Sequence, residues 1–273
     1  PAMNTAMWRH AAVQRNWAEV LGFPGVVPLL PSSGLLACDR VGDGRMADPA
    51  LIQLAAAALF SRSAEAAVAE QDWAGQRLLV TAGPTREPID GARVLSNNSS
   101  GRMGVLLAQA ARLRGAAVDL VHGPLTLPEA WLEGLECCPV GTAAELEAAL
   151  RQRQGSADAV VMAAAVADLR RDAVEQAKLA KLELPDVLAQ GWVEVPDLLA
   201  GLAEHRPEGQ LLLGFAALSG GEDALIRAGE RKRIAKGCQL MFVNPIDRQG
   251  QGFGDQANGG WLLGDGCRRE LPV

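Results

Sequence analysis

The sequence predicts an α/β protein with a doubly wound, mostly parallel sheet. From residue 77 onward, short apolar runs alternate with longer segments in which apolar residues recur at helical spacing. This alternation is typical of parallel strands joined by crossover helices. The chain has 273 residues, and a typical domain has about 100 to 200. We therefore expect one α/β domain with additional structure in front of it.

The front of the chain is predicted to be a short αβ segment. Residues 1–60 alternate turn-rich and apolar stretches, and from Pro49 to Val68 apolar residues recur at helical spacing. A stretch of mixed charge follows, which predicts a linker at residues 69–76. We therefore divide the chain into a front segment at residues 1–68, this linker, and a domain at residues 77–273.

Five strands and four helices are expected in the domain. The strands lean on Val, Leu and Met, as buried strands do, and are expected at Arg77–Ala82, Ala117–Val121, Ala157–Met162, Gln210–Leu213 and Gln239–Val243. The helices are expected at Gly101–Arg114, Ala143–Arg153, Pro196–Glu204 and Gly221–Lys236. Gly115 and Gly237 stand where C-terminal caps belong. A right-handed, Rossmann-like sheet follows from this order.

Composition and charge argue against several classes of protein. Hydrophobic residues make up 49% of the chain and charged residues 21%, as in ordinary globular proteins. No apolar run approaches the roughly 18 residues of a membrane span, so we expect a soluble protein without a membrane partner. The net charge of -6 argues against nucleic-acid binding, which needs a basic surface.

The cysteines and histidines form no recognisable metal-binding pattern. There are five cysteines and three histidines, without a CxxC pair or zinc-ligand spacing, so we expect no structural metal. The unpatterned cysteines and the lack of a cleavable leader indicate the reducing cytoplasm. The chain opens with Pro1 rather than methionine, and we expect it to be the interior of a longer protein.

Polar residues follow the predicted strands where a ligand of such a sheet would bind. Residues Thr81 to Asp90 follow the first strand, and no GxGxxG motif is present, which argues against a nicotinamide-dependent oxidoreductase. The segment Ser96 to Gly101 precedes a helix, and such helix starts bind anions. Simple helix capping is the alternative interpretation, but five consecutive polar residues exceed what one cap needs.

Two later segments add a carboxylate and two cations. Small residues after the third strand let a ligand approach the backbone, and Asp168 supplies a carboxylate there, unless it only caps a helix. Lys178 and Lys181 follow in a charged loop. Each lysine alone is more simply a solvated surface residue, but their position lets both reach a triphosphate above the sheet.

Taken together, these segments resemble the phosphopantothenate–cysteine ligases, the ligase half of the bacterial bifunctional proteins of coenzyme A synthesis. The resemblance covers residues 76–273. The matching motifs recur in order at Thr81 to Asp90, Arg93 to Gly104, Ala163 to Asp168, Gly214 to Ala217 and Lys232 to Lys236.

The resemblance implies a two-step reaction with a nucleotide. The carboxylate of 4'-phosphopantothenate attacks the α-phosphate of CTP, which is accompanied by Mg²⁺, and the amine of cysteine then displaces the nucleotide from the acyl-nucleotidylate. Asn97 matches an asparagine needed to convert the acyl intermediate, and Lys178 matches a lysine that assists its formation. The resemblance also implies a homo-oligomer, a dimer through the ligase domain.

Further site residues are carried over by matched position. Those implied at the nucleotide are Gly83, Ala164, Asp168, Lys178, Phe215, Lys232 and Lys236. Those implied at the substrate are Asp90, Arg93, Asn97, Ser99 and Ser100. No metal ligand is implied.

Two departures from the family pattern bear on activity. Leu218 and Ser219 follow Gly214 to Ala217 where relatives often have Glu-Thr, and the lysine motif retains Lys178 and Lys181 but loses a third charge. The preference for CTP or ATP is therefore open. A catalytically impaired nucleotide-binding subunit is the alternative function.

The front segment resembles the C-terminal part of the flavin-dependent phosphopantothenoylcysteine decarboxylases, which implies a partial flavodoxin-like fold. Asn4 matches an asparagine that contacts the substrate carboxylate, and Cys38 matches the cysteine that protonates the enethiolate. Asp39 replaces the usual glycine. We expect FMN and decarboxylation only in a full-length parent protein, not in this chain alone.

Overall fold

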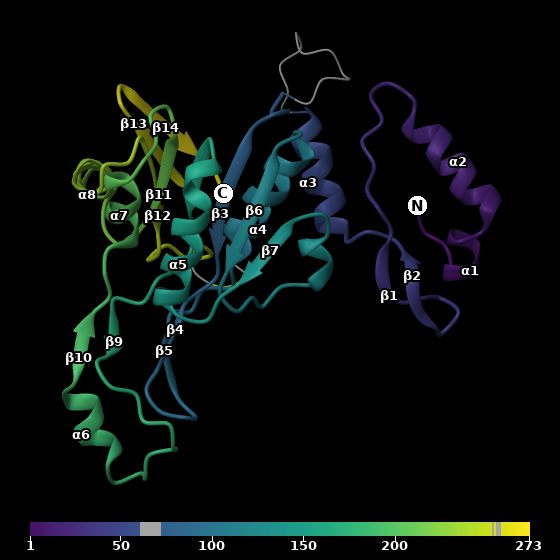
Figure 1. Ribbon diagram of the computed structural model, residues 1–273. Coiled ribbons are helices and arrows are strands. Elements are labelled where there is room, and N and C mark those ends of the chain that lie inside the picture. The colour runs from purple at the N-terminus through teal and green to yellow at the C-terminus, as the bar shows by residue number, and fades with distance from the viewer. Residues whose placement is uncertain (61–71, 253, 255–257) are drawn as a thin grey trace. The chain divides into compact units, whose positions relative to one another are not determined.

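The computed structural model, which describes residues 1–60, 72–252, 254 and 258–273, centres on an eight-stranded sheet (Figure 1). The strands lie side by side in the order β14-β13-β12-β11-β8-β3-β6-β7. Their bounds are β3 Arg77–Ala82, β6 Ala117–His122, β7 Glu136–Pro139, β8 Ala159–Met162, β11 Leu211–Leu218, β12 Leu240–Pro245, β13 Gly260–Gly264 and β14 Cys267–Leu271.

The central strands are parallel, as the sequence predicts. β3 pairs with β8, β8 with β11, β11 with β12, and β6 with β7, all in parallel. β13 and β14 extend the sheet antiparallel at one edge, and the sequence analysis missed both of them as well as β7. From β3 the chain adds β6 and then β7 toward one edge of the sheet. It then returns to the centre and adds β8, β11 and β12 toward the other edge. The doubly wound sheet is therefore confirmed, with its reversal between β3 and β8.

All four predicted helices are present within two residues of their expected ends. They are α4 Arg102–Leu113, α5 Ala143–Arg153, α7 Leu198–Glu204 and α8 Glu222–Ala235. Gly115 and Gly237 adopt φ values of 98° and 65° directly after α4 and α8. The capping glycines are thus confirmed, because the left-handed conformation ends a helix and glycine adopts it without strain.

One strand is much longer than predicted. β11 runs five residues past its expected end at Leu213, because Gly214 lies inside the strand rather than in a turn. A Cβ at Gly214 would lie 2.7 Å from Leu199 Cδ2, so the missing side chain lets α7 pack directly on the strand.

The main hydrophobic core lies between the sheet and helices α5, α7 and α8. Buried side chains of these helices, such as Leu146, Leu202 and Leu225, pack with strand residues such as Leu79 and Leu212. The start of α4 lies on the opposite face, because Gly104 faces Ala82, and alternate residues of a strand point to opposite faces. Among the described helices, none has both the length and the apolar character needed to cross a bilayer.

Two small hairpins project from the carboxyl edge of the sheet (Figure 1). The first pairs β4 Arg86–Pro88 with β5 Val94–Ser96, and the second pairs β9 Leu169–Arg171 with β10 Trp192–Glu194. Helix α6 Leu184–Ala189 lies between β9 and β10. The sequence analysis missed these elements because strands of three residues are too short to show a period.

The described chain divides into two compact units. One contains Pro1–Gln76, Leu106–Val118 and Pro128–Leu135, and the other contains Arg77–Val105, Asp119–Leu127 and Glu136–Val273. The linker expected at residues 69–76 and the end of the helix before it lie partly outside the described residues.

The first unit has its own elements and a small core. Its elements are α1 Thr5–Trp8, α2 Ala11–Leu21, β1 Ser32–Leu35, β2 Val41–Arg45, α3 Pro49–Phe60 and the 3₁₀ turn η1 Glu129–Leu132. Ala55 and Ala58 of α3 pack on Leu113 of α4. Buried Gln109 of α4 donates from Nε2 to the carbonyl oxygens of Trp131 (2.6 Å) and Glu133 (3.0 Å). The second half of α4 is therefore part of this unit.

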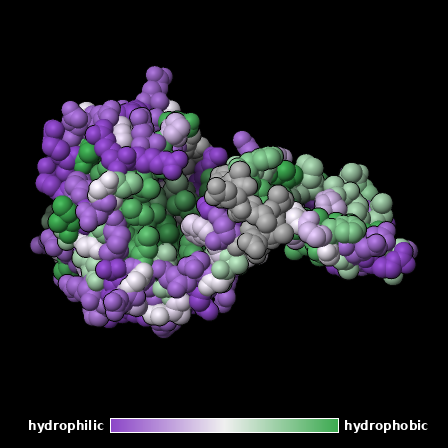
Figure 2. Space-filling view, turned by 90° about the horizontal axis from the view of Figure 1, so that it is seen from above, coloured by the Kyte–Doolittle hydropathy of each residue, from purple (hydrophilic) through white to green (hydrophobic). Residues whose placement is uncertain are grey.

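On the body that holds the large sheet, the face shown in Figure 2 is mostly hydrophilic, with apolar residues gathered in a recess. The carboxyl ends of the strands point toward the bottom of Figure 1, whereas Figure 2 is seen from above. The recess is therefore on the amino side of the sheet, away from the loops that follow β3 and β8.

Burial makes one cysteine chemically distinct from the others. Cys238 is buried in the main core, and this burial raises the pKa of its thiol to about 11. Only about one thiol in a thousand is then ionised at pH 8.

We expect iodoacetamide at pH 8 to alkylate the exposed Cys38 and Cys267 but to leave Cys238 unmodified until guanidinium unfolds the chain. Peptide mass spectrometry measures this, and alkylation of Cys238 at the rate of Cys267 would contradict the burial.

Candidate functional site

The loops that follow β3 and β8 form the candidate site. The strand order reverses between these two strands, and ligands of doubly wound sheets bind outside the carboxyl ends of the strands at such a reversal. The chain passes from β3 through the β4–β5 hairpin to the start of α4, and from β8 into residues 163–168. These are the segments in which the sequence places most of the predicted site residues.

Two buried threonines hold the loop after β8 against the end of β3. Thr81 Oγ1 accepts a hydrogen bond from Ala164 N (2.9 Å), and Thr85 Oγ1 accepts one from Ala167 N (3.0 Å). Between them, Gly83 O accepts from the backbone of the same loop at 2.9 Å. The predicted nucleotide-site residues Gly83 and Ala164 are therefore brought together on two tightly joined loops.

Asn97 crosses from the loop before α4 to the loop after β8. Its Nδ2 donates to Ala165 O (3.1 Å) and Val166 O (3.0 Å). Because both neighbours are acceptors, the amide nitrogen must face them and the Oδ1 atom must face away. Asn97 is exposed, so its Oδ1 is presented at the surface of the site.

Ser99 and Ser100 lie at the start of α4. Ser99 Oγ accepts from Gly101 N (3.3 Å), and Ser100 Oγ accepts from Arg102 N (3.4 Å) while donating to Gly254 O (2.8 Å). The simpler interpretation of this segment as a cap accounts for these serine contacts. It does not account for Asn97, whose side chain bonds to a different loop.

The first turn of α4 lies directly against the end of β3. A Cβ at Gly101 would lie 3.1 Å from Gly83 N, and a Cβ at Gly104 would lie 2.4 Å from Thr81 O. Glycine at both positions permits this approach. The positive end of the helix therefore lies beside Gly83, at a point suited to a negatively charged group.

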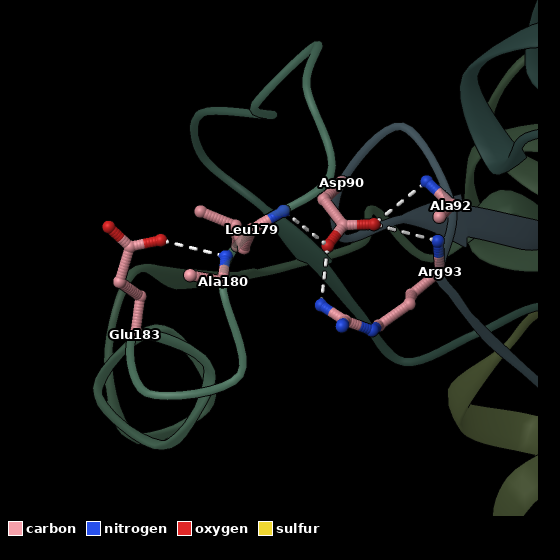
Figure 3. Close-up of polar contacts among 6 residues, drawn as sticks. All are labelled: Asp90, Ala92, Arg93, Leu179, Ala180 and Glu183. Carbon is pink, nitrogen blue, oxygen red and sulfur yellow. Dashed lines mark hydrogen bonds and ion pairs between the residues drawn. The ribbon is translucent and has the colours of Figure 1, made fainter.

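Buried Asp90 and partly exposed Arg93 form an ion pair beside the loop that carries Lys178 (Figure 3). Asp90 Oδ2 accepts from Arg93 Nη1 (2.7 Å) and from Leu179 N (3.2 Å), and Oδ1 accepts from the backbone N–H groups of Ala92 and Arg93 (2.8 Å each). Burial alone raises the pKa of Asp90, but the backbone donors and the guanidinium outweigh it and hold this pKa below its ordinary value. Lys178 itself is exposed.

Asp168 and Phe215 lie along the same edge. Asp168 is exposed, and its backbone oxygen accepts from Val195 N at 2.9 Å. Gly214 of β11 is opposite Met162 of β8, so Phe215 is level with the start of the loop after β8. Its half-buried ring packs on Phe242 with 5.6 Å between centroids.

Lys232 in α8 and Lys236 just after it have different surroundings. Lys236 follows the end of α8, but its side chain reaches Asp197, which precedes α7 by one residue and follows Val195 by two. Burial raises the pKa of Asp197, but Lys236 and the N–H of Ala200 outweigh it and lower that pKa. Lys232 is exposed, and within the part of the chain that the structure describes no ion pair joins its side chain to the loops after β3 and β8.

Asn4 and Cys38 belong to the first unit, which contains Pro1–Gln76. Asn4 Oδ1 accepts from Met7 N (2.8 Å) and caps α1. Cys38 is exposed in the turn between β1 and β2, next to Asp39, whose φ is 58°. A Cβ at Gly44 of β2 would lie 2.2 Å from Met3 O, so the segment before Asn4 runs against the same hairpin.

The sequence analysis assigned no role to three buried polar residues of this site. Thr81, Thr85 and Glu87 lie in the first matched motif, and all are at most 2% exposed. Glu87 Oε1 accepts from Ala143 N (2.8 Å) and so caps α5. The available signal was their position, because polar residues next to a buried strand need partners in the neighbouring loops.

A family model gives the first comparison with known proteins. Residues 73–273 match the model described as DNA/pantothenate metabolism flavoprotein C-terminal domain. The CoaBC coenzyme A biosynthesis bifunctional protein of Escherichia coli (strain K12) is 38% identical over 277 residues, covering 100% of this chain and 64% of the relative. CoaBC of Bacillus subtilis (strain 168) is 38% identical over 276 residues with coverage of 100% and 64%. The chain thus spans less than two thirds of the length of these curated relatives.

Solved structures share the fold, and the family model fixes the family. The crystal structure of the C-terminal domain of CoaBC has a TM-score of 0.58 at 30% identity, covering 73% of this chain and 87% of that chain. A Cab2 mutant in complex with phosphopantothenate-cysteine has a TM-score of 0.56 at 16% identity, covering 82% and 88%, a likeness of fold. Because the family model matches most of its length, the chain belongs to the family of the DNA/pantothenate metabolism flavoprotein C-terminal domain.

Proposed function

We propose that the chain is a phosphopantothenate–cysteine ligase of coenzyme A synthesis. The observation that carries this proposal is the bond of Asn97 to the carbonyl oxygens of Ala165 and Val166, which joins two of the family's motifs at the reversal of the sheet. Relatives named for coenzyme A biosynthesis and a neighbour solved with phosphopantothenate-cysteine support it. Decarboxylation with FMN is proposed for a full-length protein only.

The first step forms an acyl-nucleotidylate. A carboxylate oxygen of 4'-phosphopantothenate bonds to the α-phosphorus of CTP, and the bond to the departing pyrophosphate breaks. Gly83, Ala164 and the start of α4 present backbone and small side chains to the nucleotide, and Asp168 and Phe215 border it. Lys178 and Arg93 offset the negative charge that gathers as these anions meet.

The second step forms the amide. The amine nitrogen of cysteine bonds to the acyl carbon, the nucleoside monophosphate leaves with the bonding electrons, and the amine loses a proton. Asn97 Oδ1 faces away from the loop that holds Nδ2, so it can accept a hydrogen bond from the attacking amine. This orients the nitrogen toward the acyl carbon.

Magnesium fits this site as a companion of the triphosphate. No group of three or more His, Cys, Asp or Glu residues suited to a metal occurs among the described residues. Magnesium is commonly bound through phosphate oxygens, one or two carboxylates and water, and the exposed Asp168 offers a carboxylate at the edge. When bound, the ion would neutralise phosphate charge.

The chain is also proposed to act as a homodimer through the ligase domain, in the reducing cytoplasm. All five cysteines are free thiols, as such a compartment favours. Large apolar side chains are exposed on and between β9 and β10, where a partner would cover them: Leu169, Val174, Leu182, Leu188 and Val193.

The ligase reaction gives the first prediction of this proposal. Protein with 4'-phosphopantothenate, cysteine, Mg²⁺ and either CTP or ATP should release pyrophosphate and form phosphopantothenoylcysteine. Asn97→Ala should still release pyrophosphate but accumulate the acyl-nucleotidylate, because the amine loses its acceptor. Coupled pyrophosphate detection and mass spectrometry measure both, with Gln152→Ala, at an exposed position of α5, as control. Folded wild-type protein that releases no pyrophosphate would favour an impaired nucleotide-binding subunit.

The lysine loop gives the second prediction. Lys178→Ala should slow pyrophosphate release by about 100-fold, since it removes a cation placed at the developing charge. Lys181→Ala should have a smaller effect, because Lys181 is farther along the chain from Leu179, where the loop is bonded to Asp90. Single-turnover pyrophosphate release compares the two. Equal rates for Lys178→Ala and wild type would remove this lysine from the mechanism.

The dimer gives the third prediction. Light scattering after size exclusion should give about twice the chain mass of 28.7 kDa. Leu182, which is 90% exposed, should be buried by the partner, so Leu182→Glu should shift the mass toward the monomer. Ile234→Glu on α8, also at an exposed apolar residue, serves as matched control. A Leu182→Glu protein that stays dimeric would exclude this surface.

A further inference from the structure

We propose that Asp90 is a positioning residue, whose carboxylate fastens the loop carrying Lys178 to the loop carrying Arg93. This inference rests on the proposed function, and it replaces the prediction that Asp90 contacts the substrate. The side chain of Asp90 is 0% exposed, and donors already occupy both of its oxygens (Figure 3). A substrate could reach this carboxylate only after these bonds had broken.

The four donors to Asp90 come from two separate parts of the chain. Three of them belong to its own turn, from Ala92 and Arg93. The fourth is Leu179 N at 3.2 Å, which is 89 residues away in sequence and directly follows Lys178. The carboxylate therefore does more than close a local turn, because one oxygen is shared between the guanidinium and the distant loop.

A second contact joins the same two loops. A Cβ on Gly91 would lie 2.2 Å from Gln176 O and 3.2 Å from its carbonyl carbon. The two backbones therefore meet next to Asp90 at a distance that any side chain at position 91 would prevent. We call the attachment of these two loops, at Asp90–Leu179 and Gly91–Gln176, the joint. The Gly91 contact depends on space and not on charge, so it supports the joint independently of the carboxylate.

The loop is fixed on the far side of Lys178 as well. Glu183 Oε2 accepts from Ala180 N (2.9 Å), and Glu183 N donates to Ala180 O (3.1 Å), as Figure 3 shows for the side-chain bond. The main-chain N–H groups of Leu179 and Ala180 are thus both held by carboxylates, while the side chain of Lys178 remains exposed. A fixed backbone keeps the ammonium group of Lys178 within reach of the phosphates for more of the time.

The same carboxylate also orients Arg93. One Nη1 bond of 2.7 Å holds the guanidinium, whose side chain is 28% exposed. Guanidinium has five N–H donors, and within the described ranges no other acceptor is bonded to the side chain of Arg93. Asp90 therefore leaves part of the guanidinium turned outward, and it sets the positions of the two cations together.

Limited trypsin digestion tests the joint without any assumption about activity. Trypsin cleaves after Lys178 and Lys181, and cleavage requires the loop to open. We expect Asp90→Asn to speed these cleavages by about tenfold, the effect of losing a hydrogen bond to a charged group. Gly91→Ala should speed them as well, because its Cβ would force the two backbones apart. The matched controls are Asp186→Asn, an exposed carboxylate of α6, and Gly155→Ala, where a Cβ meets no atom within 4 Å.

The fragments are timed by mass spectrometry, with circular dichroism melting to confirm that each variant is folded. Wild-type cleavage rates in both Asp90→Asn and Gly91→Ala would overturn the joint. Faster cleavage in these two and not in the controls would support it. This result stands whether or not the wild-type chain turns over substrate, so it is separate from the ligase proposal.

Pyrophosphate release then tests whether the joint serves Lys178. If Asp90 positions Lys178, Asp90→Asn should slow the first step, and its effect should be smaller in the double variant with Lys178→Ala, where only the orientation of Arg93 is left to lose. Independent effects that multiply in the double variant would show that Asp90 acts elsewhere, and would overturn its positioning role. Wild-type protein without turnover would instead contradict the proposed function.

Discussion

The reversal of strand order between β3 and β8 is the constraint on which the rest of the site depends. At this point the chain leaves neighbouring strands in opposite directions across the sheet, so the loops meet with few crossover elements to cover them. Their backbone groups still need partners, because unpaired buried N–H groups are costly. Thr81 and Thr85 supply those partners from side chains, which leaves the backbone fixed and the edge open.

This arrangement explains why small residues dominate the site. The loop from Met162 to Asp168 contains four alanines and one valine, and it uses its own main-chain groups to bond to Thr81, Gly83 and Thr85. Bulky side chains would fill the space that the proposed reaction requires for its nucleotide. At the start of α4, Gly101 and Gly104 serve the same end from the other side, because they bring the positive helix end onto Gly83.

Periodicity predicted the sheet and its helices, since long amphipathic segments and buried strands leave a clear pattern in this chain. It missed β9 and β10, whose three residues carry no period, and β13 and β14, which extend the sheet antiparallel. For the site, motif order indicated which residues meet, as for Asn97 and Ala164. It did not distinguish contact with substrate from support, because the burial of Asp90 depends on Leu179, a partner distant in sequence.

Two carboxylates of this unit show how environment divides their roles. Asp197 is exposed, and an exposed ion pair such as its contact with Lys236 contributes only about 0 to 1 kcal/mol. A triphosphate carries several negative charges and can therefore draw Lys236 away from Asp197. Asp90 is instead enclosed by four donors, and breaking one of its bonds leaves part of a buried carboxylate unsatisfied. In the proposed reaction, the exposed pair is suited to exchange partners, and the buried one to hold the loops in place.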